Sequence, residues 1–487
     1  MKSILLVTCF GFTQILFAQS FSEVLMDPPL QGPYYGAVAF ADVNGDDHPD
    51  ILITGQDEFG NSGDPLSKLY LNDGSGNFTE MTGAPLAAVG YGAVAFADVN
   101  DDNAPDLLIT GQDNTDTPIS KLYINDGSGN FTEKADTPLV GVNYGSVVFS
   151  DVNDDDSPDL LLVGITNTID LIAKLYINDG AGNFTEKTDL TLKGMGFCSA
   201  AFSDVNNDDS PDILMAGLNS SNDTDVRLYL NDGVGNFTEM ENTPFEKVYY
   251  SSLAFSDVNG DNYPDVLITG QNQFIGGDLI AKIYTNDGAG NFTEVMDTPF
   301  EGIRYGSVAF SDANRDSHPD VLITGLNGSI RSSTKLYTND GAGNFTEAGD
   351  LPFEDAAYSS IAFADVNDDF SEDILIAGID NLAIPFSKLY LNEVISSLSD
   401  NPTDFSFDFA LFPNPTKASS INVSLASKIN DLTQVKVIDL SGRLVIQKTI
   451  DAGSRLYPLD ISGLEKGTYI LEVTNGVRGG RQQFTVQ

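Results

Sequence analysis

The sequence predicts an all-β protein: a seven-bladed β-propeller closed by an N-terminal strand, followed by a small C-terminal β-sandwich. Three observations predict this fold class. One unit of sequence occurs seven times, each complete unit contains four strand-like runs, and the last unit lacks a strand that the start of the chain can supply. Units of about 40–50 residues with four strands each are typical of propeller blades.

The repeat is visible by eye. Residues 39–55 read AFADVNGDDHPDILITG, and residues 95–111 read AFADVNDDNAPDLLITG. Five further copies follow, and the first aspartates of successive copies are 56, 53, 53, 53, 55 and 53 residues apart. A second phrase, KLYLNDGSGNFTE at 68–80, recurs in step with the first. Self-similarity at a fixed period indicates a repeat architecture.

Four runs in the first unit are predicted to be strands. They lie at 35–41, 50–55, 68–72 and 78–81, and an Asn-Asp-Gly turn at 72–74 separates the last two. The seventh unit stops at residue 392 without its fourth run, but residues 21–24 (FSEV) match residues 292–295 (FTEV). We therefore expect the N-terminal strand to complete the last blade, which leaves only short, protected edges.

The N-terminus predicts export. Lys2, an apolar run over residues 4–17 and the small residue Ala18 are typical of a signal peptide. The run is short for a membrane helix and no second one follows, so no transmembrane segment is expected. The predicted division is a signal peptide at 1–18, the propeller at 19–392, a linker at 393–404 and a second domain at 405–487. Cys198 would be the one cysteine left after signal removal, which excludes an intramolecular disulfide and favours a small packing role.

Each copy carries the motif Asp-x-Asn-x-Asp-x-x-x-Asp, which predicts up to seven Ca²⁺ ions, one per blade. Calcium takes six to eight oxygen ligands from a flexible loop, and three carboxylates this close repel one another without a cation. No Glu stands at position 12, so the motif is not an EF-hand. Asx-rich turns are the alternative reading. The predicted ligands are Asp42, Asn44, Asp46, Asp50, Asp98, Asn100, Asp102, Asp106, Asp151, Asn153, Asp155, Asp159, Asp204, Asn206, Asp208, Asp212, Asp257, Asn259, Asp261, Asp265, Asp312, Asn314, Asp316, Asp320, Asp365, Asn367, Asp369 and Asp373.

This pattern resembles the FG-GAP or VCBS repeats that form the blades of integrin α-subunits and of many bacterial surface proteins. The resemblance covers roughly residues 21–392. It implies that the calcium loop joins the first and second strands of a blade. All seven copies have Asn at the third position, where the family also uses Asp, so each loop carries one negative charge fewer.

The chain is strongly acidic, with 71 Asp and Glu against 24 Lys and Arg and a net charge of −47. A nucleic-acid partner is not expected, because phosphate binding requires clustered Lys and Arg. Seven calcium ions would offset part of this charge, and the remainder would be a solvated acidic surface.

An aromatic residue opens the first strand of every unit. These side chains could stack sugars near the mouth of the central channel, or they could wedge between adjacent blades. The connections between second and third strands vary most between copies, whereas the calcium loops barely vary. We therefore expect calcium to be structural and a ligand to meet the opposite face. The aromatic candidates for ligand binding are Tyr35, Tyr91, Tyr144, Phe197, Tyr250, Tyr305 and Tyr358.

The C-terminal segment has short alternating runs at 435–440, 444–449 and 468–473, which predict a small β-sandwich. Its segments LFPNP at 411–415, VIDLSGR at 437–443 and GTY at 467–469 resemble the type IX secretion sorting domain of Bacteroidota. The resemblance implies that the type IX machinery is a partner and that the protein reaches the cell surface or the extracellular space. An independent adhesion module is the alternative.

Two functions are weighed. The first is a non-catalytic binding or adhesion scaffold for glycans or proteins, and we expect no enzyme activity. The second is a propeller-based polysaccharide lyase or hydrolase. The chain has two histidines, His48 and His318, and both fall at position 7 of a calcium loop, so no Ser-His or Cys-His pair can be assembled elsewhere. The absence of Trp weakens the glycan reading, because Trp is a favoured stacking residue.

Overall fold

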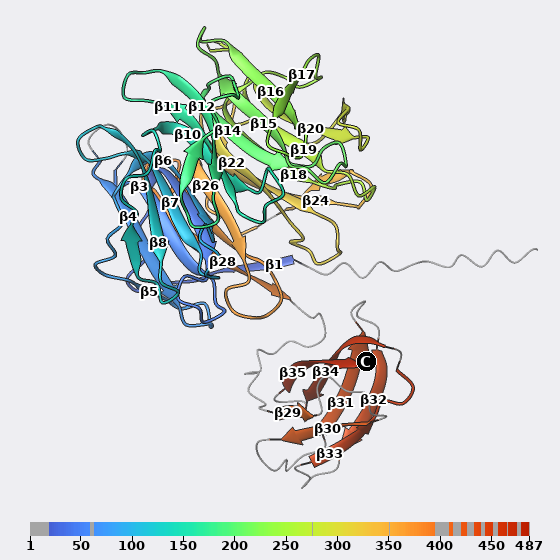
Figure 1. Cartoon of the computed structure of the whole chain (residues 1–487). Coiled ribbons are helices and arrows are strands. Elements are labelled where there is room, and N and C mark those ends of the chain that lie inside the picture. The colour runs from blue at the N-terminus through green and yellow to red at the C-terminus, as the bar shows by residue number, and fades with distance from the viewer. Residues whose placement is uncertain are drawn as a thin grey trace, which may run out of the picture. The chain divides into compact units, whose positions relative to one another are not determined.

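The computed structural model describes residues 19–58, 63–274, 276–349, 351–394, 409–412, 420–425, 433–439, 444–450, 456–464, 466–474 and 479–486 (Figure 1). The predicted signal peptide and most of the predicted linker lie outside these residues. Every regular element in them is a strand, and none of these residues forms a helix that is long and apolar enough to cross a membrane. The chain divides into two compact units at residues 396 and 397.

The first unit contains seven four-stranded antiparallel sheets in a propeller-like arrangement, which we call blades one to seven in the order of their acidic motifs. The first strands are β2 (Tyr34–Ala41), β6 (Gly90–Ala97), β10 (Asn143–Ser150), β14 (Gly196–Ser203), β18 (Tyr249–Ser256), β22 (Arg304–Ser311) and β26 (Ala357–Ala364). The second strands are β3 (Asp50–Gln56), β7 (Asp106–Gln112), β11 (Asp159–Ile165), β15 (Asp212–Leu218), β19 (Asp265–Gln271), β23 (Asp320–Leu326) and β27 (Asp373–Ile379).

The third strands are β4 (Pro65–Asn72), β8 (Pro118–Asn125), β12 (Leu171–Asn178), β16 (Thr224–Asn231), β20 (Leu279–Asn286), β24 (Ser332–Asn339) and β28 (Pro385–Val394). The fourth strands are β5 (Phe78–Glu80), β9 (Phe131–Glu133), β13 (Phe184–Glu186), β17 (Phe237–Met240), β21 (Phe292–Glu294), β25 (Phe345–Glu347) and, in blade seven, β1 (Gln19–Glu23). The first strands, such as β10 and β14, lie toward the middle of the unit, and fourth strands such as β5 and β17 lie at its rim (Figure 1).

The N-terminal strand β1 completes blade seven, as the repeat predicted. It pairs antiparallel with β28, and Phe21 stands opposite Asn392 as Phe78 stands opposite Asn72 in blade one. The pairing continues to Gln19 opposite Val394. The third strand therefore runs two residues beyond its predicted end at 392, because β1 offers two more partners there.

The core lies between neighbouring blades. All residues of β3 are buried, because this strand is covered on both faces. One face contributes Leu52 to a cluster with Leu107 and Ile109 of blade two, and the other contributes Ile51 to a cluster with Leu375 of blade seven. Each fully buried Leu or Ile contributes about 1.5–3 kcal/mol. A continuous apolar run such as ILIT is thus the expected sequence of a strand buried on two sides.

The second unit has a three-stranded sheet, in the order β29-β30-β33, and a four-stranded sheet, in the order β32-β31-β34-β35. Buried residues of both sheets, among them Ile421, Val437 and Phe484, share one core, as in a β-sandwich. The predicted LFPNP segment is described only to Phe412, the last residue of β29. The strands are β29 (Phe409–Phe412), β30 (Ser420–Leu425), β31 (Thr433–Asp439), β32 (Leu444–Ile450), β33 (Leu456–Asp460), β34 (Gly467–Thr474) and β35 (Gly479–Val486).

Candidate functional sites

The acidic motif lies where the sequence placed it, in the loop between the first and second strands of each blade. In blade one the loop wraps around Asp42, whose Oδ1 accepts the N–H groups of Gly45 (2.8 Å) and Asp46 (3.2 Å). Its Oδ2 accepts the N–H of Asp47 at 2.8 Å. Gly45 and Asp47 take left-handed backbone angles, with φ of 74° and 67°. Gly, Asn and Asp tolerate this conformation, which explains why they fill most of these loops.

The ninth residue of the motif, Asp50 in blade one, begins the second strand and is buried. Its Oδ2 accepts the N–H of Val43 at 2.9 Å, and its Oδ1 accepts the N–H of Asn72 at 2.8 Å. Burial is the main reason that the pKa of this carboxyl is raised to about 6, and the nearby charges of Asp46 and Asp42 add to the rise. Asp50 therefore fastens the loop to the end of the third strand.

The donor set of the loops suits a hard cation, because every predicted ligand offers an oxygen. Two of these oxygens, Oδ1 of Asn153 and Oδ1 of Asn206, are buried without a hydrogen-bond partner. A buried oxygen without a partner costs about 1–3 kcal/mol, which a bound cation would offset. Within the described residues, however, no three His, Cys, Asp or Glu side chains are arranged to hold a metal. Calcium binding therefore stays a prediction.

In the described conformation, hydrogen bonds within the loop hold the third and fifth motif residues. Asn44 Nδ2 donates to Asp46 Oδ2 at 2.9 Å, and Asp46 Oδ1 accepts the N–H of His48 at 3.0 Å. These bonds are those of an Asx-rich turn, the alternative that the sequence left open. They engage only part of the acceptor capacity of each carboxylate, so they are compatible with a cation as well.

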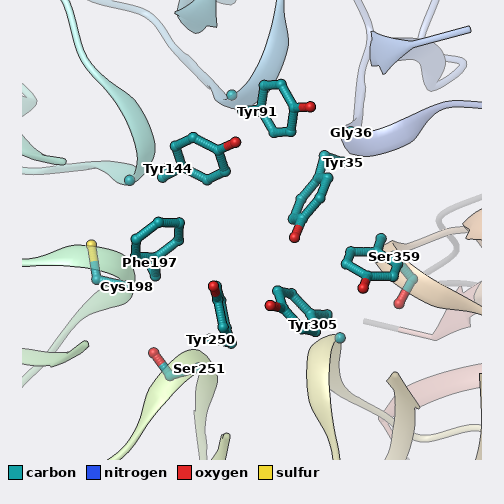
Figure 2. Close-up of a pocket in the computed structure, with 14 residues that line it drawn as sticks. Tyr35, Gly36, Tyr91, Tyr144, Phe197, Cys198, Tyr250, Ser251, Tyr305 and Ser359 are labelled. Carbon is teal, nitrogen blue, oxygen red and sulfur yellow. The ribbon is translucent and has the colours of Figure 1, made fainter. Parts of the chain in front are cut away.

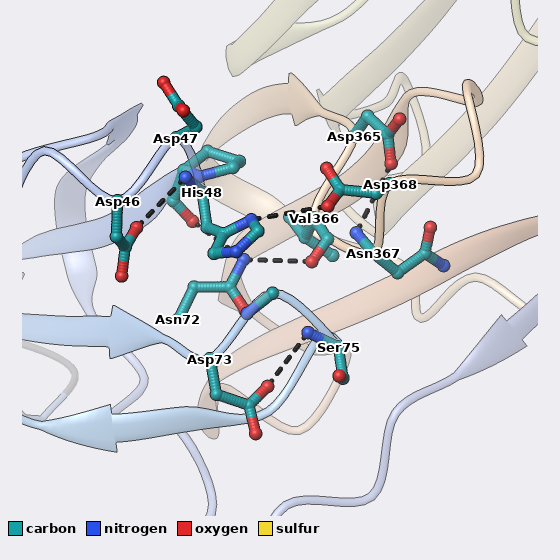
Figure 3. Close-up of polar contacts among 12 residues, drawn as sticks. Asp46, Asp47, His48, Asn72, Asp73, Ser75, Asp365, Val366, Asn367 and Asp368 are labelled. Atoms are coloured by element: carbon teal, nitrogen blue, oxygen red, sulfur yellow. Dashed lines mark hydrogen bonds and ion pairs between the residues drawn. The ribbon is translucent and has the colours of Figure 1, made fainter. Parts of the chain in front are cut away.

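The loops of blades one and seven lie side by side (Figure 3). His48 Nδ1 is 3.5 Å from Asp368 Oδ2, and Asn72 Nδ2 donates to the carbonyl oxygen of Val366 at 2.9 Å. The side chain of His48 thus faces the neighbouring blade.

The Asn72 contact recurs at every blade junction and was missed by sequence reasoning, which took the Asn-Asp-Gly phrase as a turn. Each buried asparagine at the end of a third strand donates to a carbonyl in the acidic loop of the preceding blade. We call this contact the inter-blade latch. The pairs are Asn72–Val366, Asn125–Val43, Asn178–Val99, Asn231–Val152, Asn286–Val205, Asn339–Val258 and Asn392–Ala313, with distances of 2.8–2.9 Å. Its presence in all seven repeats was the available signal.

The seven aromatic residues of the first strands meet in one ring (Figure 2). Neighbouring ring centroids are 3.8–5.0 Å apart all the way round. Tyr35 also reaches Tyr144 at 5.9 Å and Tyr305 at 5.8 Å. The ring lines an open hollow of about 140 Å³ together with the residue that follows each aromatic, Cys198 among them.

Each aromatic residue of the ring has a left-handed backbone, with φ between 47° and 53°. The register of each first strand shifts at this point, for example between Tyr34 and Ala37. A bulky residue in this conformation costs about 1–2 kcal/mol, whereas an aromatic pair contributes about 0.5–1.5 kcal/mol beyond its buried area. The packing thus roughly offsets the strain.

Burial raises the pKa of the hydroxyls of Tyr35, Tyr144 and Tyr305 well above the ordinary range, so these groups stay protonated. The contacts between rings of adjacent blades agree with a structural role, in which the aromatic side chains wedge between the blades. The hollow also leaves room for one small sugar ring, or the end of a glycan chain, to stack on the aromatic side chains.

A model described as FG-GAP-like repeat matches residues 42–109, 98–162, 151–215, 204–268, 257–323 and 312–376, which together span more than half of the chain. A secretion system C-terminal sorting domain matches residues 410–487. A curated relative, the T-cell immunomodulatory protein homolog of Plasmodium yoelii yoelii, is 23% identical over 390 residues, which are 63% of this chain and 55% of that protein.

Solved structures that resemble the chain are distant. AofleA from Arthrobotrys oligospora has a TM-score of 0.38 at 12% identity, covering 77% of this chain and 91% of its own. The six-bladed fucose-recognising lectin of Aleuria aurantia has a TM-score of 0.38 at 11% identity, covering 66% and 98%. An ancestral GH74 enzyme has a TM-score of 0.44 at 12% identity, covering 94% and 63%. These low scores indicate only a distant likeness of fold. The repeat model matches more than half of the chain, so this chain belongs to the family of FG-GAP-like repeat proteins, and it carries a secretion system C-terminal sorting domain.

Proposed function

We propose that this protein is a secreted, calcium-stabilised, closed seven-bladed propeller that binds an extracellular ligand without transforming it. Glycans are the favoured ligand class, and a protein is the other candidate. The type IX machinery exports the chain by way of the C-terminal unit, and the mature protein acts at the outer cell surface or beyond it.

Closure of the ring is supported by contacts between blades one and seven. The Val38 N–H donates to Ser360 Oγ at 3.1 Å, and the rings of Tyr34 and Tyr358 are 5.1 Å apart. The latch from Asn72 to Val366 has the same length as the latches at the other junctions. A closed ring protects the sheet edges that an open array would expose.

The observation that carries the binding role is the contrast between the two ends of the blades. Residues of the acidic loops repeat in all seven blades, and both histidines lie there. The opposite end carries the connections that differ, and it bears the aromatic hollow and a larger cavity between blades five and six. A rigid scaffold with one variable surface is the usual plan of a binding protein.

A second candidate is a polysaccharide lyase or hydrolase. The observation that favours it is that the cavity between blades five and six is lined by the carboxylates of Asp278 and Glu301 as well as by Arg304. Acid–base catalysis needs such groups within hydrogen-bond reach of the scissile bond.

One experiment separates the two functions. The mature protein, loaded with calcium, is screened on a glycan array, and each glycan that binds is then incubated with the protein and analysed for shortened or unsaturated products. We expect retention of at least one glycan without turnover. Turnover that is lost on Glu301→Gln would replace the binding role by the catalytic one, and an array without any bound glycan would leave a protein ligand.

A further inference from the structure

A cavity of about 780 Å³ lies between blades five and six, at the end of the blades opposite the acidic loops. Its polar lining includes Gln271 at the end of β19, Glu301 and Arg304 at the start of blade six, and Asn327 in the next loop. Ile330 adds an apolar side chain. Sites for small molecules span about 300–1,000 Å³ and use a few converging polar groups, so this cavity has the size and lining of a ligand site.

Arg304 is peculiar to blade six. It is the first residue of β22, and the first residues of the other six first strands are uncharged. They are Tyr34, Gly90, Asn143, Gly196, Tyr249 and Ala357. The repeat itself therefore does not require an arginine at this position.

Arg304 is held in place without a carboxylate. Its Nη1 donates to Gln271 Oε1 at 2.7 Å, and its guanidinium carbon lies 5.3 Å from the centre of the Tyr305 ring. In the described part of the chain it forms no ion pair, although Arg227 and Arg315 both lie beside carboxylates. A guanidinium has five N–H donors. One is used here, so an oriented cation remains free to pair with an incoming anion, and a carboxylate is the geometric match.

The rest of the lining limits what that anion can be. Glu301 accepts from Asn327 Nδ2 at 3.2 Å and from Ser333 Oγ at 2.6 Å, and it keeps unused acceptor sites. Asp278 is exposed at the same cavity. These carboxylates would repel a second negative charge but would accept hydrogen bonds from hydroxyl groups. The lining thus suits one carboxylate surrounded by hydroxyls, and an acidic peptide, with several carboxylates and few donors, fits it worse.

Ile330 supports a contact at this edge. Its side chain is 74% exposed and its φ is 56°. The same loop position holds Asp116, Ile169, Asn222 and Ala383 in blades two, three, four and seven, all with left-handed angles, and Ile169 is 81% exposed. Strain and exposure at this position therefore recur in the fold, and Ile330 differs from Ile169 in lining the cavity beside Arg304. It offers an apolar surface against which the face of a sugar ring can pack.

The geometry points to an acidic saccharide as the ligand of this cavity, with the carboxylate of one uronic acid unit paired with Arg304 and its hydroxyls bonded to Glu301, Asp278 and Asn327. This inference rests on the proposed glycan-binding function and names the site and the ligand class. Ile330 covers one face of the sugar.

The test uses the calcium-loaded full-length mature protein and three probes: a trisaccharide with a single galacturonic acid unit, the neutral trisaccharide with galactose in its place, and a short poly-glutamate peptide. Calorimetry is performed on the wild type and on Arg304→Gln, Arg304→Lys and the matched control Arg331→Gln, an exposed arginine in the adjacent loop. We expect the uronate to bind the wild type and to lose affinity about tenfold or more in Arg304→Gln, since bonds to charged groups contribute about 1.5–3 kcal/mol. Arg304→Lys should restore part of the affinity, and Arg331→Gln should change nothing.

Circular dichroism and melting temperature show whether each variant folds, and the lysine variant carries the test if the glutamine variant does not. Equal uronate affinity in the wild type and either Arg304 variant would overturn the inference. Preference for the neutral trisaccharide or for poly-glutamate would overturn it too, while glycans bound elsewhere would leave the proposed function standing. The glycan-binding part of the proposed function fails separately if no glycan binds at any site, and a protein ligand then remains.

Discussion

The two ends of the blades follow opposite rules. At one end, the acidic loops repeat in all seven blades and the Asn-Asp-Gly turns in six. The buried aspartate of each second strand accepts the N–H of its third-strand asparagine at 2.8 Å in every blade. We call this end the calcium-loop face. At the other end, which we call the variable face, the connections differ in length and chemistry, and Arg304 has no counterpart.

The difference indicates which end of the blades tolerates changes in sequence. Every contact on the calcium-loop face joins one blade to its neighbour or fixes a loop to its own blade, so a change in one copy disturbs a junction. Connections on the variable face join strands that the core already holds, so they can change without unfolding the sheets. We therefore propose that the first face serves stability and that the second carries the proposed binding role.

The largest expected effect is the loss of calcium from the calcium-loop face. A metal that binds only the folded chain stabilises it by about 2.7 kcal/mol per site when its free concentration is a hundred times the dissociation constant. With several sites, chelation should lower the melting temperature by roughly 10 °C or more. Differential scanning calorimetry with EDTA, followed by added calcium, measures this effect.

Magnesium serves as the control for the chelation experiment. It sheds its water reluctantly and prefers fewer protein ligands, so it should restore little of the lost melting temperature. A melting temperature that does not respond to EDTA would mean that the loops are Asx-rich turns and that the calcium prediction is wrong.

The next effect concerns tyrosines that anchor the variable face. A buried tyrosine of each third strand accepts, through its hydroxyl, an N–H from the connection between blades, as Tyr390 does from Glu354 at 2.8 Å. Burial raises the pKa of Tyr176 and Tyr390 from 10.0 to about 12. The folded state thus disfavours the ionised form. This stability is complete below pH 10 and is lost as the pH rises toward 12, at about 1.4 kcal/mol per pKa unit for each ring.

Alkaline titration should therefore show tyrosinate absorbance appearing together with loss of the β-sheet signal. Tyr176→Phe removes both the ionisable group and the acceptor of the Val140 N–H, so it should lower the stability at neutral pH and reduce the further loss between pH 10 and 12. Ionisation of the buried rings near pH 10 in a chain that stays folded would contradict this anchoring role.

The sequence predicted the parts of both faces that repeat. Periodicity located the strands to within a few residues, because alternation and turn residues are local signals. The run predicted at 68–72 begins instead at Pro65, since its first residues vary in sequence but pair with the end of the buried strand β3.

Other features depend on residues that are distant in sequence. The left-handed backbone of Tyr35 places its side chain against the rings of Tyr91, Tyr144, Tyr305 and Tyr358 from other blades. No local sequence pattern predicts contacts between residues so far apart in the chain. The Arg304 cavity depends on Gln271, 33 residues away. The latch of Asn231 reaches Val152, 79 residues away. The latch asparagine recurs visibly in the sequence, but its place in an Asn-Asp-Gly turn was sufficient to explain it. Its hydrogen bond to the neighbouring blade was therefore not predicted.

The smallest effect sharpens the comparison at the latch, because it tests whether the junction between blades one and seven equals the others. Replacing Asn231 with Ala leaves the buried carbonyl of Val152 without its donor, which costs about 1–3 kcal/mol. Asn72→Ala does the same to Val366 at the junction of the first and last blades. In a closed ring the two variants should lower the unfolding midpoint in urea by similar amounts.

The control is Asn236→Ala. The exposed Asn236 side chain bonds only within its own turn, so this variant should leave the midpoint almost unchanged. A clearly smaller loss in Asn72→Ala than in Asn231→Ala would mean that the ring is open in solution, because Asn72 would then lose only its bonds to Pro49 and Gly74 within blade one.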